Sequence, residues 1–187
     1  KVIKDKRIKG AMLFIIPSYC PSCNSKAIKK NNESVLRCTN VNCKAKIQGQ
    51  IEHYVSKNCL NIDGIGNKII ELLISNKLIN NFSDLYKLNI EQISILDRMG
   101  NKSAQNIINS INKSKQTTLA KFIHGLGIRN VGHNAAKLLE KKFSTDIYKL
   151  INSSNEELIK INEFGEIMAN SLVTYFSNLN NINNIKT

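Results

Sequence analysis

Apolar positions recur along residues 62–172 at fixed distances from four glycines. In each case one apolar residue directly precedes the glycine, and others lie four positions before it, four after it and seven after it. A pattern repeated in this way indicates one structural unit used four times. The four glycines are Gly66, Gly100, Gly132 and Gly165.

The residues that follow each glycine have helical spacing. Ala104, Ile107, Ile108 and Ile111 fall at i, i+3, i+4 and i+7, which predicts an amphipathic helix after Gly100. The residues just before each glycine predict a tight turn, whose backbone geometry glycine tolerates best. Each unit is therefore expected to be helix, short hairpin, helix. Unpaired N–H groups of such a hairpin suit a phosphate oxygen, and the units resemble helix-hairpin-helix motifs, which bind the DNA backbone.

A longer repeat groups the four units in pairs. The pattern Asp-aliphatic-Tyr-Lys-Leu occurs at 84–88 and again at 146–150, and corresponding glycines of the two halves are 66 and 65 residues apart. The first two hairpins thus form one half and the last two form the other. Two hairpins related by a local pseudo-twofold axis match the symmetry of the two strands across a minor groove. A purely structural array of helices is the alternative interpretation.

The four hairpins differ in the residues that would meet a phosphate. The second has Arg98 where the first has a glycine, and the third has Asn130, which tolerates the left-handed conformation better than most residues. The fourth carries Glu163 and Glu166, which would repel a phosphate, so we expect it to be mainly structural. The candidate DNA-binding residues are Gly64, Ile65, Gly66, Lys68, Arg98, Gly100, Lys102, Ser103, Arg129, Asn130, Gly132, His133 and Gly165.

Four cysteines precede these repeats in two close pairs. Cys20 and Cys23 are separated by 14 residues from Cys38 and Cys43. This spacing allows four thiolates to converge on one tetrahedral ion, and Zn²⁺ is the expected occupant, with Zn–S distances of about 2.3 Å. Two disulfides or four unlinked thiols are the alternatives, although nothing in the sequence indicates secretion. So small a segment has little core, so metal binding would supply its folding energy.

The fifth cysteine and the histidines show no ligand spacing of their own. We interpret Cys59 as a small buried apolar residue and not as a fifth zinc ligand. His53, His124 and His133 show no pairing typical of metal ligands. His53 is interpreted as a packing residue, and His133, which follows the third glycine, as a candidate phosphate contact.

The charge of the chain favours a polyanionic partner. The formal net charge is +13, and residues 1–60 hold 12 of the 27 lysines and arginines but 3 of the 14 acidic residues. The repeats are only mildly basic, which fits binding by amides and a few placed cations. A compositional bias toward lysine, asparagine and isoleucine is the alternative explanation. No apolar run approaches the 18 residues that a membrane span needs, so no membrane partner is expected.

The expected fold is mainly α, with a small four-cysteine zinc finger followed by an all-α domain of four helix-hairpin-helix motifs in two tandem pseudo-twofold pairs. Because the chain begins with lysine, we expect a piece of a longer protein or a processed one. The apolar run that ends residues 1–16 predicts the last strand of a preceding domain. The expected parts are therefore 1–16, the zinc finger at 17–48, the helical domain at 49–177 and a linker or frayed end at 178–187.

This combination resembles part of one enzyme family, the bacterial NAD-dependent DNA ligases. The similar motifs are Cys20-Pro21-Ser22-Cys23, Arg37-Cys38-Thr39-Asn40, Asn61-Ile62-Asp63-Gly64-Ile65-Gly66, Arg98-Met99-Gly100-Asn101-Lys102-Ser103 and Leu126-Gly127-Ile128-Arg129-Asn130-Val131-Gly132. The resemblance covers nearly the whole chain, and residues 1–16 are similar to the end of that family's OB-fold. The resemblance implies a cytoplasmic, nucleoid-associated protein that acts in DNA replication and repair.

The resemblance also implies partners outside this chain. In the family, an adenylation domain transfers AMP from NAD to a lysine of a Lys-x-Asp-Gly motif and then to a 5′-phosphate at a nick, while the hairpins hold the minor groove. This sequence has no Lys-x-Asp-Gly motif. NAD and Mg²⁺ are therefore expected only in the missing adenylation part. The expected partners are nicked double-stranded DNA, contacted through its phosphate backbone, and the N-terminal adenylation and OB-fold domains.

Three hypotheses remain open at this point. The chain is the DNA-clamping part of such a ligase, or a free-standing zinc and hairpin module that assists repair or junction processing. The third hypothesis is a helical scaffold that binds proteins. The strand predicted at 11–16 favours the first, because it lacks a sheet of its own.

Overall fold

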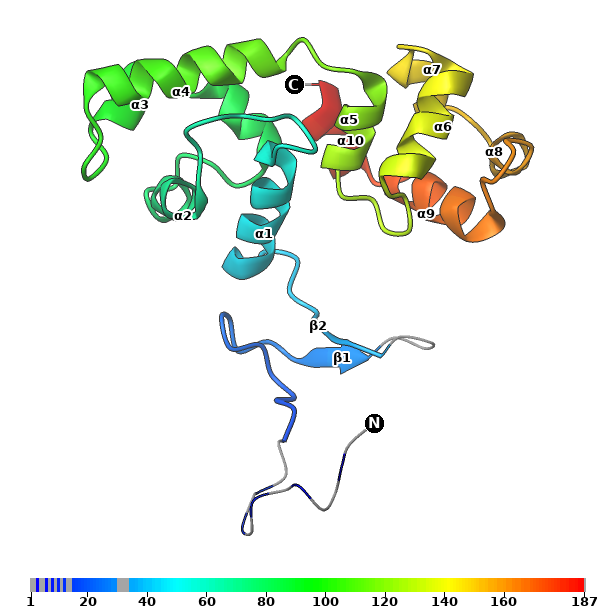
Figure 1. Cartoon of the computed structure of the whole chain (residues 1–187), viewed down its shortest axis with the longest axis horizontal. Coiled ribbons are helices and arrows are strands. Elements are labelled where there is room, and N and C mark those ends of the chain that lie inside the picture. The colour runs from blue at the N-terminus through cyan, green and yellow to red at the C-terminus, as the bar shows by residue number, and fades with distance from the viewer. Residues whose placement is uncertain are drawn as a thin grey trace. The chain divides into compact units, whose positions relative to one another are not determined.

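The computed structural model describes residues 15–29 and 34–186, together with positions 3, 6, 8, 10 and 12. The chain divides into two compact units, 1–44 and 45–187 (Figure 1). The strand expected at the end of residues 1–16 lies largely outside the described residues.

The first unit is a small hairpin with almost no core. Strand β1 (Ala27–Lys29) pairs antiparallel with β2 (Leu36–Cys38), with Ala27 opposite Cys38. An isolated bridge between Tyr19 and Lys26 extends the pairing toward the first two cysteines. Among the described residues of this unit only Cys43 is buried. Apolar burial therefore contributes little to its stability, as the sequence predicted.

The second unit is helical throughout its described length, which confirms the expected mainly α fold. Helices α2, α4, α6 and α9 each follow one of the four repeated glycines. The helices are α1 (Lys44–Val55), α2 (Asn67–Ser75), the 3₁₀ helix η2 (Phe82–Lys87), α3 (Ile90–Ser94), α4 (Asn101–Ser114), α5 (Leu119–Gly125), α6 (His133–Phe143), α7 (Ile147–Ile151), α8 (Asn155–Ile159), α9 (Glu166–Phe176) and α10 (Leu179–Lys186).

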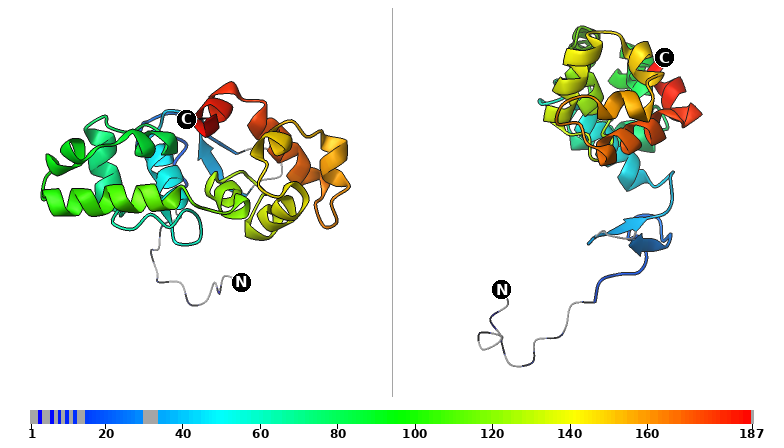
Figure 2. Two further views of the ribbon diagram at one scale, coloured as in Figure 1. Left: turned by 90° about the horizontal axis from the view of Figure 1, so that it is seen from above. Right: turned by 90° about the vertical axis from the view of Figure 1, so that its right-hand side faces the viewer.

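Two apolar clusters form the core of this unit. The first cluster is formed by side chains from α1 through α4, and the second by side chains from α5 through α9. In Figures 1 and 2 the helices of the first cluster lie at one end of the unit and α6 to α9 at the other, with α5 between them. Phe82 and Phe122 each pack against both clusters. The grouping into two halves that the longer repeat predicted is thus visible in the packing.

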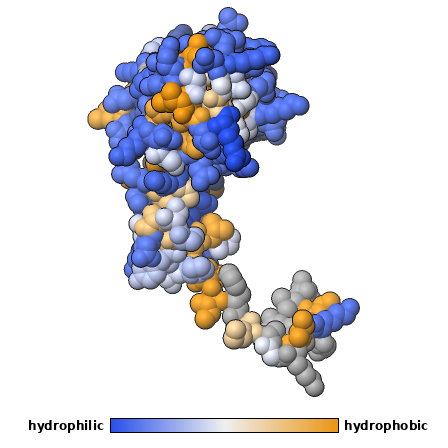
Figure 3. Space-filling model, turned by 90° about the vertical axis from the view of Figure 1, so that its left-hand side faces the viewer, coloured by the Kyte–Doolittle hydropathy of each residue, from blue (hydrophilic) through white to orange (hydrophobic). Residues whose placement is uncertain are grey.

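The helical periodicity predicted after Gly100 is confirmed by burial. Helix α4 begins at Asn101, and its residues Ala104, Ile107 and Ile111 are buried in the first cluster. The opposite face of α4 is polar. The face of the molecule shown in Figure 3 is mostly hydrophilic, with its apolar residues in small separate groups. Within the described part of the chain no helix is both long and apolar enough to cross a membrane.

The end of the chain differs from the expected linker. Residues Leu179–Lys186 form helix α10, which lies against α9 and η2. Its Ile185 packs against the second cluster. The asparagine-rich composition hid this helix, because its apolar residues Leu179, Ile182 and Ile185 are few, although their spacing of three is helical.

Candidate zinc site and nucleic-acid interface

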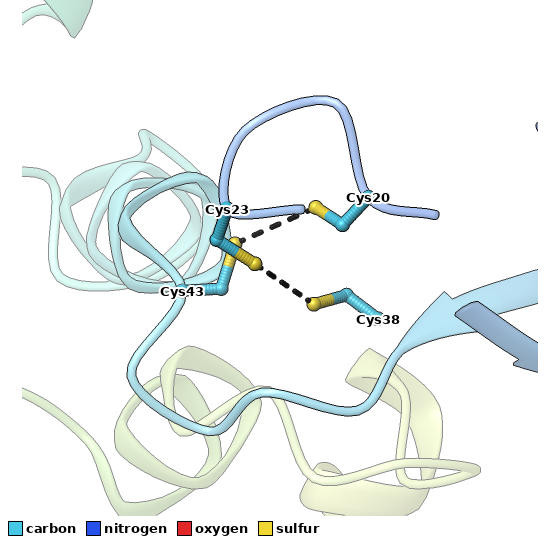
Figure 4. A group of neighbouring side chains, drawn as sticks. All are labelled: Cys20, Cys23, Cys38 and Cys43. Atoms are coloured by element: carbon cyan, nitrogen blue, oxygen red, sulfur yellow. Dashed lines mark hydrogen bonds between the residues drawn. The ribbon is translucent and has the colours of Figure 1, made fainter. Parts of the chain in front are cut away.

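The four paired cysteines converge in the first unit. The Sγ atoms of Cys20 and Cys43 are 3.8 Å apart and those of Cys23 and Cys38 are 3.4 Å apart (Figure 4). All four sulfur atoms lie within 4.8 Å of one another. Four sulfurs placed tetrahedrally around Zn²⁺ at about 2.3 Å would be about 3.8 Å apart. The donor set and its spacing therefore fit one zinc ion, and no disulfide links these cysteines.

Local backbone geometry brings the four thiols together. Cys20 and Cys23 lie in a tight turn closed by a hydrogen bond from the Cys20 N–H to the Ser25 carbonyl, with Asn24 in the left-handed conformation at φ +53°. Cys38 ends β2, and Cys43 directly precedes α1. Each ligand pair is thus held by a turn rather than by a core.

The surroundings shift the pKa values of Cys23 and Cys38 in opposite directions. Hydrogen bonds from the side chain and backbone of Ser25 lower the pKa of Cys23 to about 6. Desolvation among the other sulfurs raises the pKa of Cys38 to about 12. Four thiolates at these distances would repel one another, so a cation is needed for all four to ionise together.

The four hairpins share one backbone conformation. The residue two positions before each repeated glycine has a positive φ: +85° at Gly64, +60° at Arg98, +60° at Asn130 and +62° at Glu163. Glycine occupies this position only in the first hairpin. The structure therefore confirms that Asn130 stands where a left-handed residue is required, and it shows that Arg98 and Glu163 adopt the same conformation at a cost.

The repeated glycines themselves have ordinary backbone angles, which corrects the expectation that the turn geometry requires them. Their φ values are −91° at Gly66, −107° at Gly100, −84° at Gly132 and −74° at Gly165. A Cβ atom added at any of the four would meet nothing within 4 Å. Neither strain nor packing explains these glycines. They leave open space in front of four helix N-termini.

These four helix N-termini also lack side-chain caps. No side chain accepts a hydrogen bond from the first turn of α2, α4, α6 or α9, whose N–H groups have no partner within the helix. Five shorter helices, η2, α3, α5, α7 and α8, are different, because a side chain caps each of them. The capping residues are Asn81, Asn89, Thr118, Asp146 and Ser154. The four glycine-led N-termini therefore differ from these five in having first-turn N–H groups that no side chain caps.

The predicted contact residues fall into exposed and buried groups. The side chain of Ile65 is buried, so this residue could meet DNA only through its backbone. Its counterparts Val131 and Phe164 are buried in the second cluster, as the pattern predicted. The remaining candidates are exposed, namely Gly64, Gly66, Lys68, Arg98, Gly100, Lys102, Ser103, Arg129, Asn130, Gly132, His133 and Gly165.

Within each half, the first hairpin is hydrogen-bonded to the helix that follows the second hairpin. The Ser110 hydroxyl on α4 accepts a hydrogen bond of 2.7 Å from the Asp63 N–H of the first hairpin. In the second half, Asn130 Nδ2 donates to Ser171 Oγ on α9 at 2.9 Å. A Cβ atom at Gly64 would lie 3.0 Å from Ile107 Cγ1, so the first hairpin also packs closely on α4.

The structure brings together histidines that the sequence left unpaired. His53 Nε2 donates to the His124 carbonyl at 2.8 Å and lies 3.7 Å from Cys59 Sγ. The rings of His124 and His133 are 5.5 Å apart. Burial lowers the pKa of His124, and the nearby His53 and His133 lower it further. The interpretation of Cys59 as buried is confirmed, since it is 0% exposed.

The longer repeat contained a signal for this cluster. Cys59 and Gly125 each lie seven residues before a repeated glycine, Gly66 or Gly132. In the structure a Cβ atom at Gly125 would lie 3.4 Å from Cys59 Cβ. Because these two repeat counterparts lie against each other, their neighbours in the sequence are brought together as well.

Comparison with known proteins identifies three segments. Residues 19–45 match the NAD-dependent DNA ligase C4 zinc finger domain. Residues 57–113 match a SAM-like helix-hairpin-helix tandem, and residues 121–185 match a helix-hairpin-helix motif. Each of the two latter segments spans two of the repeated glycines.

Curated relatives match along nearly the whole chain. A DNA ligase of Clostridioides difficile (strain 630) is 43% identical over 189 residues, which cover 100% of this chain and 28% of that protein. DNA ligases of Carboxydothermus hydrogenoformans and Bacillus subtilis (strain 168) are each 42% identical, over 97% and 94% of this chain. The chain spans about 26–28% of the length of these relatives. The chain therefore belongs to the family of bacterial NAD-dependent DNA ligases and corresponds to their zinc finger and helix-hairpin-helix region.

Proposed function

We propose that this chain binds duplex DNA through its phosphate backbone and acts as the clamp region of an NAD-dependent ligase that seals nicks in replication and repair. The observation that carries the proposal is the set of four uncapped helix N-termini, each fronted by a glycine with open space before it. Backbone N–H groups and the helix dipole at such a terminus favour a phosphate oxygen.

The exposed cations beside three of these N-termini would add to the attraction. Lys68 lies in the first turn of α2 and Lys102 in that of α4, while Arg98 and Arg129 lie in the second and third hairpins. Amides and a few cations bind any phosphate alike, so they fix position and carry no sequence information. The fourth hairpin is proposed to contribute less, because Glu163 and Glu166 flank its glycine.

The nucleotide-transfer chemistry is proposed to lie outside this chain. No Lys-x-Asp-Gly motif is present, so nothing here could accept AMP from NAD. NAD and Mg²⁺ would act in the adenylation part of the whole protein. The four cysteines would hold a structural zinc, because all four positions of the tetrahedron are filled by protein ligands and none is left for water or substrate.

Fluorescence anisotropy with short labelled duplexes tests the proposal. Affinity should be independent of base sequence and should fall as salt rises. With one or two phosphates for each competent hairpin, and with the placed cations, log K against log salt should have a slope of roughly −4 to −7, at about 0.9 for each phosphate neutralised. Binding that is insensitive to salt would contradict backbone recognition.

A complementation assay on a nicked duplex then tests the clamp role. Mixing the chain with a ligase part that holds the adenylation and OB-fold domains should increase sealing of a nicked duplex. The chain alone should neither take up label from NAD nor seal the nick. A free-standing accessory module would bind DNA equally well but would leave sealing by that part unchanged.

A further inference from the structure

A second group of metal-ligating side chains lies in the helical unit, apart from the four paired cysteines. One ligand atom each from His53, Cys59 and His124 lies within 4.8 Å of the others. His53 is on α1, Cys59 is in the segment between α1 and α2, and His124 is on α5. Side chains of different elements thus meet at the place where the two halves of the unit join.

The spacing within this group suits a metal ion. Around Zn²⁺, a nitrogen at about 2.0–2.1 Å and a sulfur at about 2.3 Å would be about 3.6 Å apart. The observed distance between His53 Nε2 and Cys59 Sγ is 3.7 Å. The His53 and His124 rings meet edge to face with their centroids 5.0 Å apart. All three ligand atoms lie within 4.8 Å of one another, so a rotation of the histidine rings would bring them to a shared metal ion.

Close packing of the backbone creates this arrangement. Gly125, the neighbour of His124, has no side chain, and a Cβ there would lie 2.6 Å from Leu60 Cδ2 and 3.4 Å from Cys59 Cβ. Because a glycine occupies this position, α5 approaches the segment that carries Cys59. Of the three side chains, His53 lines a cavity of about 420 Å³, together with Gly49 and Gly127 among others, so the group is approached from solvent on the His53 side.

We propose that His53, Cys59 and His124 form a second metal site, which takes a borderline divalent cation such as Zn²⁺ or Co²⁺ and leaves a fourth coordination position open. Zinc sites with an open position have three protein ligands, and imidazole nitrogens and thiolates occur together among those ligands. On binding, the Cys59 thiol releases its proton to solvent, and His53 carries its remaining ring proton on Nδ1. The hydrogen bond from His53 to the His124 carbonyl is lost, so this site binds more weakly than the four-cysteine site.

The bound ion would tie the two halves of the helical unit together. His53 and Cys59 belong to the first half, whereas His124 belongs to the second. Since all three side chains are at least half-buried, a metal there would stabilise the contact between α5 and the segment before the first hairpin. This inference does not depend on DNA binding.

Metal titration of the intact chain tests the proposal. The chain is first loaded with one zinc equivalent and kept under a non-chelating reductant, and Co²⁺ is then added while thiolate-to-metal charge-transfer absorption is followed. We expect a second equivalent to bind and to raise the melting temperature. Cys59→Ser and His124→Asn should each abolish the second equivalent and the rise in melting temperature, while the first equivalent is retained.

A matched control uses the neighbouring histidine. His133 is exposed and lies outside the group of three, so His133→Asn should keep both equivalents. The proposal is overturned if wild-type protein takes up no second equivalent at about 1 mM Co²⁺, or if Cys59→Ser and His124→Asn, both folded by circular dichroism, still bind it as wild type does. A Cys23→Ser variant, which disables the four-cysteine site, should still show the second site.

Discussion

Replacing Gly66 by alanine isolates the role of the open space in front of a helix N-terminus. The backbone at Gly66, with φ −91° and ψ 176°, is one that alanine adopts without strain. The added Cβ would meet no atom of the protein within 4 Å. The substitution therefore adds one methyl group at the point where a phosphate is proposed to approach, and it changes little else.

The expected effects on stability and binding differ in size. Alanine is a poorer N-cap residue than glycine by about 0.5–1 kcal/mol, and it lowers the entropy of the unfolded chain by a similar amount, about 0.4–1 kcal/mol, so the two nearly cancel. A hydrogen bond from an amide to a charged phosphate contributes about 1.5–3 kcal/mol. Loss of one such contact should weaken DNA binding about 10-fold to 150-fold, since 1.4 kcal/mol is a factor of ten.

The assay pairs fluorescence anisotropy on a short duplex at low salt with urea unfolding of the same preparation. Gly165→Ala is the matched control, because Gly165 has the same extended backbone and the same open space. Its hairpin carries Glu163 and Glu166, so its loss of affinity should be about twofold or less. Every duplex sequence should be affected alike by Gly66→Ala.

Two results would refute this reasoning. If folded Gly66→Ala protein bound DNA as tightly as wild type, no phosphate would approach the N-terminus of α2. If Gly165→Ala lost as much affinity as Gly66→Ala, the acidic residues would not distinguish the fourth hairpin from the first. A large loss of stability in Gly66→Ala would instead show that the glycine serves the fold.

Further predictions concern metal, strain and packing. Cys43→Ser should lose the tightly held zinc equivalent, measured by elemental analysis, and wild-type protein should release this zinc as pH falls, because acid protonates the thiolates. Glu163→Gly should raise the free energy of unfolding in urea by up to about 1 kcal/mol, because φ is +62° at this position; an unchanged value would show that the conformation costs little. Gly125→Ala should lower it by about 1–3 kcal/mol, because the new Cβ would lie 2.6 Å from Leu60 Cδ2, and a neutral result would mean that α5 can move away freely.

The repeated spacing made most of the helical unit predictable. The positions of α2, α4, α6 and α9, and the burial of Ile65, Val131 and Phe164 in three of the turns, follow from local periodicity and from the fixed distance to a glycine. The corresponding residue of the second turn, Met99, is only partly buried. The cysteine spacing likewise predicted the convergence of the four thiols. These features depend on residues that lie close together in the sequence.

Features that depend on contacts across the chain were not predicted. A left-handed residue was expected at Asn130, but the turn geometry was also expected to require the repeated glycines. The backbone angles show that in each hairpin the residue two positions earlier, Gly64, Arg98, Asn130 or Glu163, has the positive φ instead. The histidine and cysteine group arises from packing across the junction of the two halves, between residues 71 positions apart at its longest span. Helix α10 was missed because its sequence contains few strong helix formers. Tertiary contacts of its few apolar side chains stabilise it instead.

Two aromatic side chains shared by both apolar clusters have a consequence for how the helical unit unfolds. Phe82 belongs to the first half and Phe122 to the second, yet each packs on both clusters, and Tyr54 stacks on Phe82 with ring centroids 4.6 Å apart. Cutting the unit between its halves would expose both rings to water and leave each cluster incomplete. The two halves should therefore melt in a single cooperative transition, and neither half should fold alone.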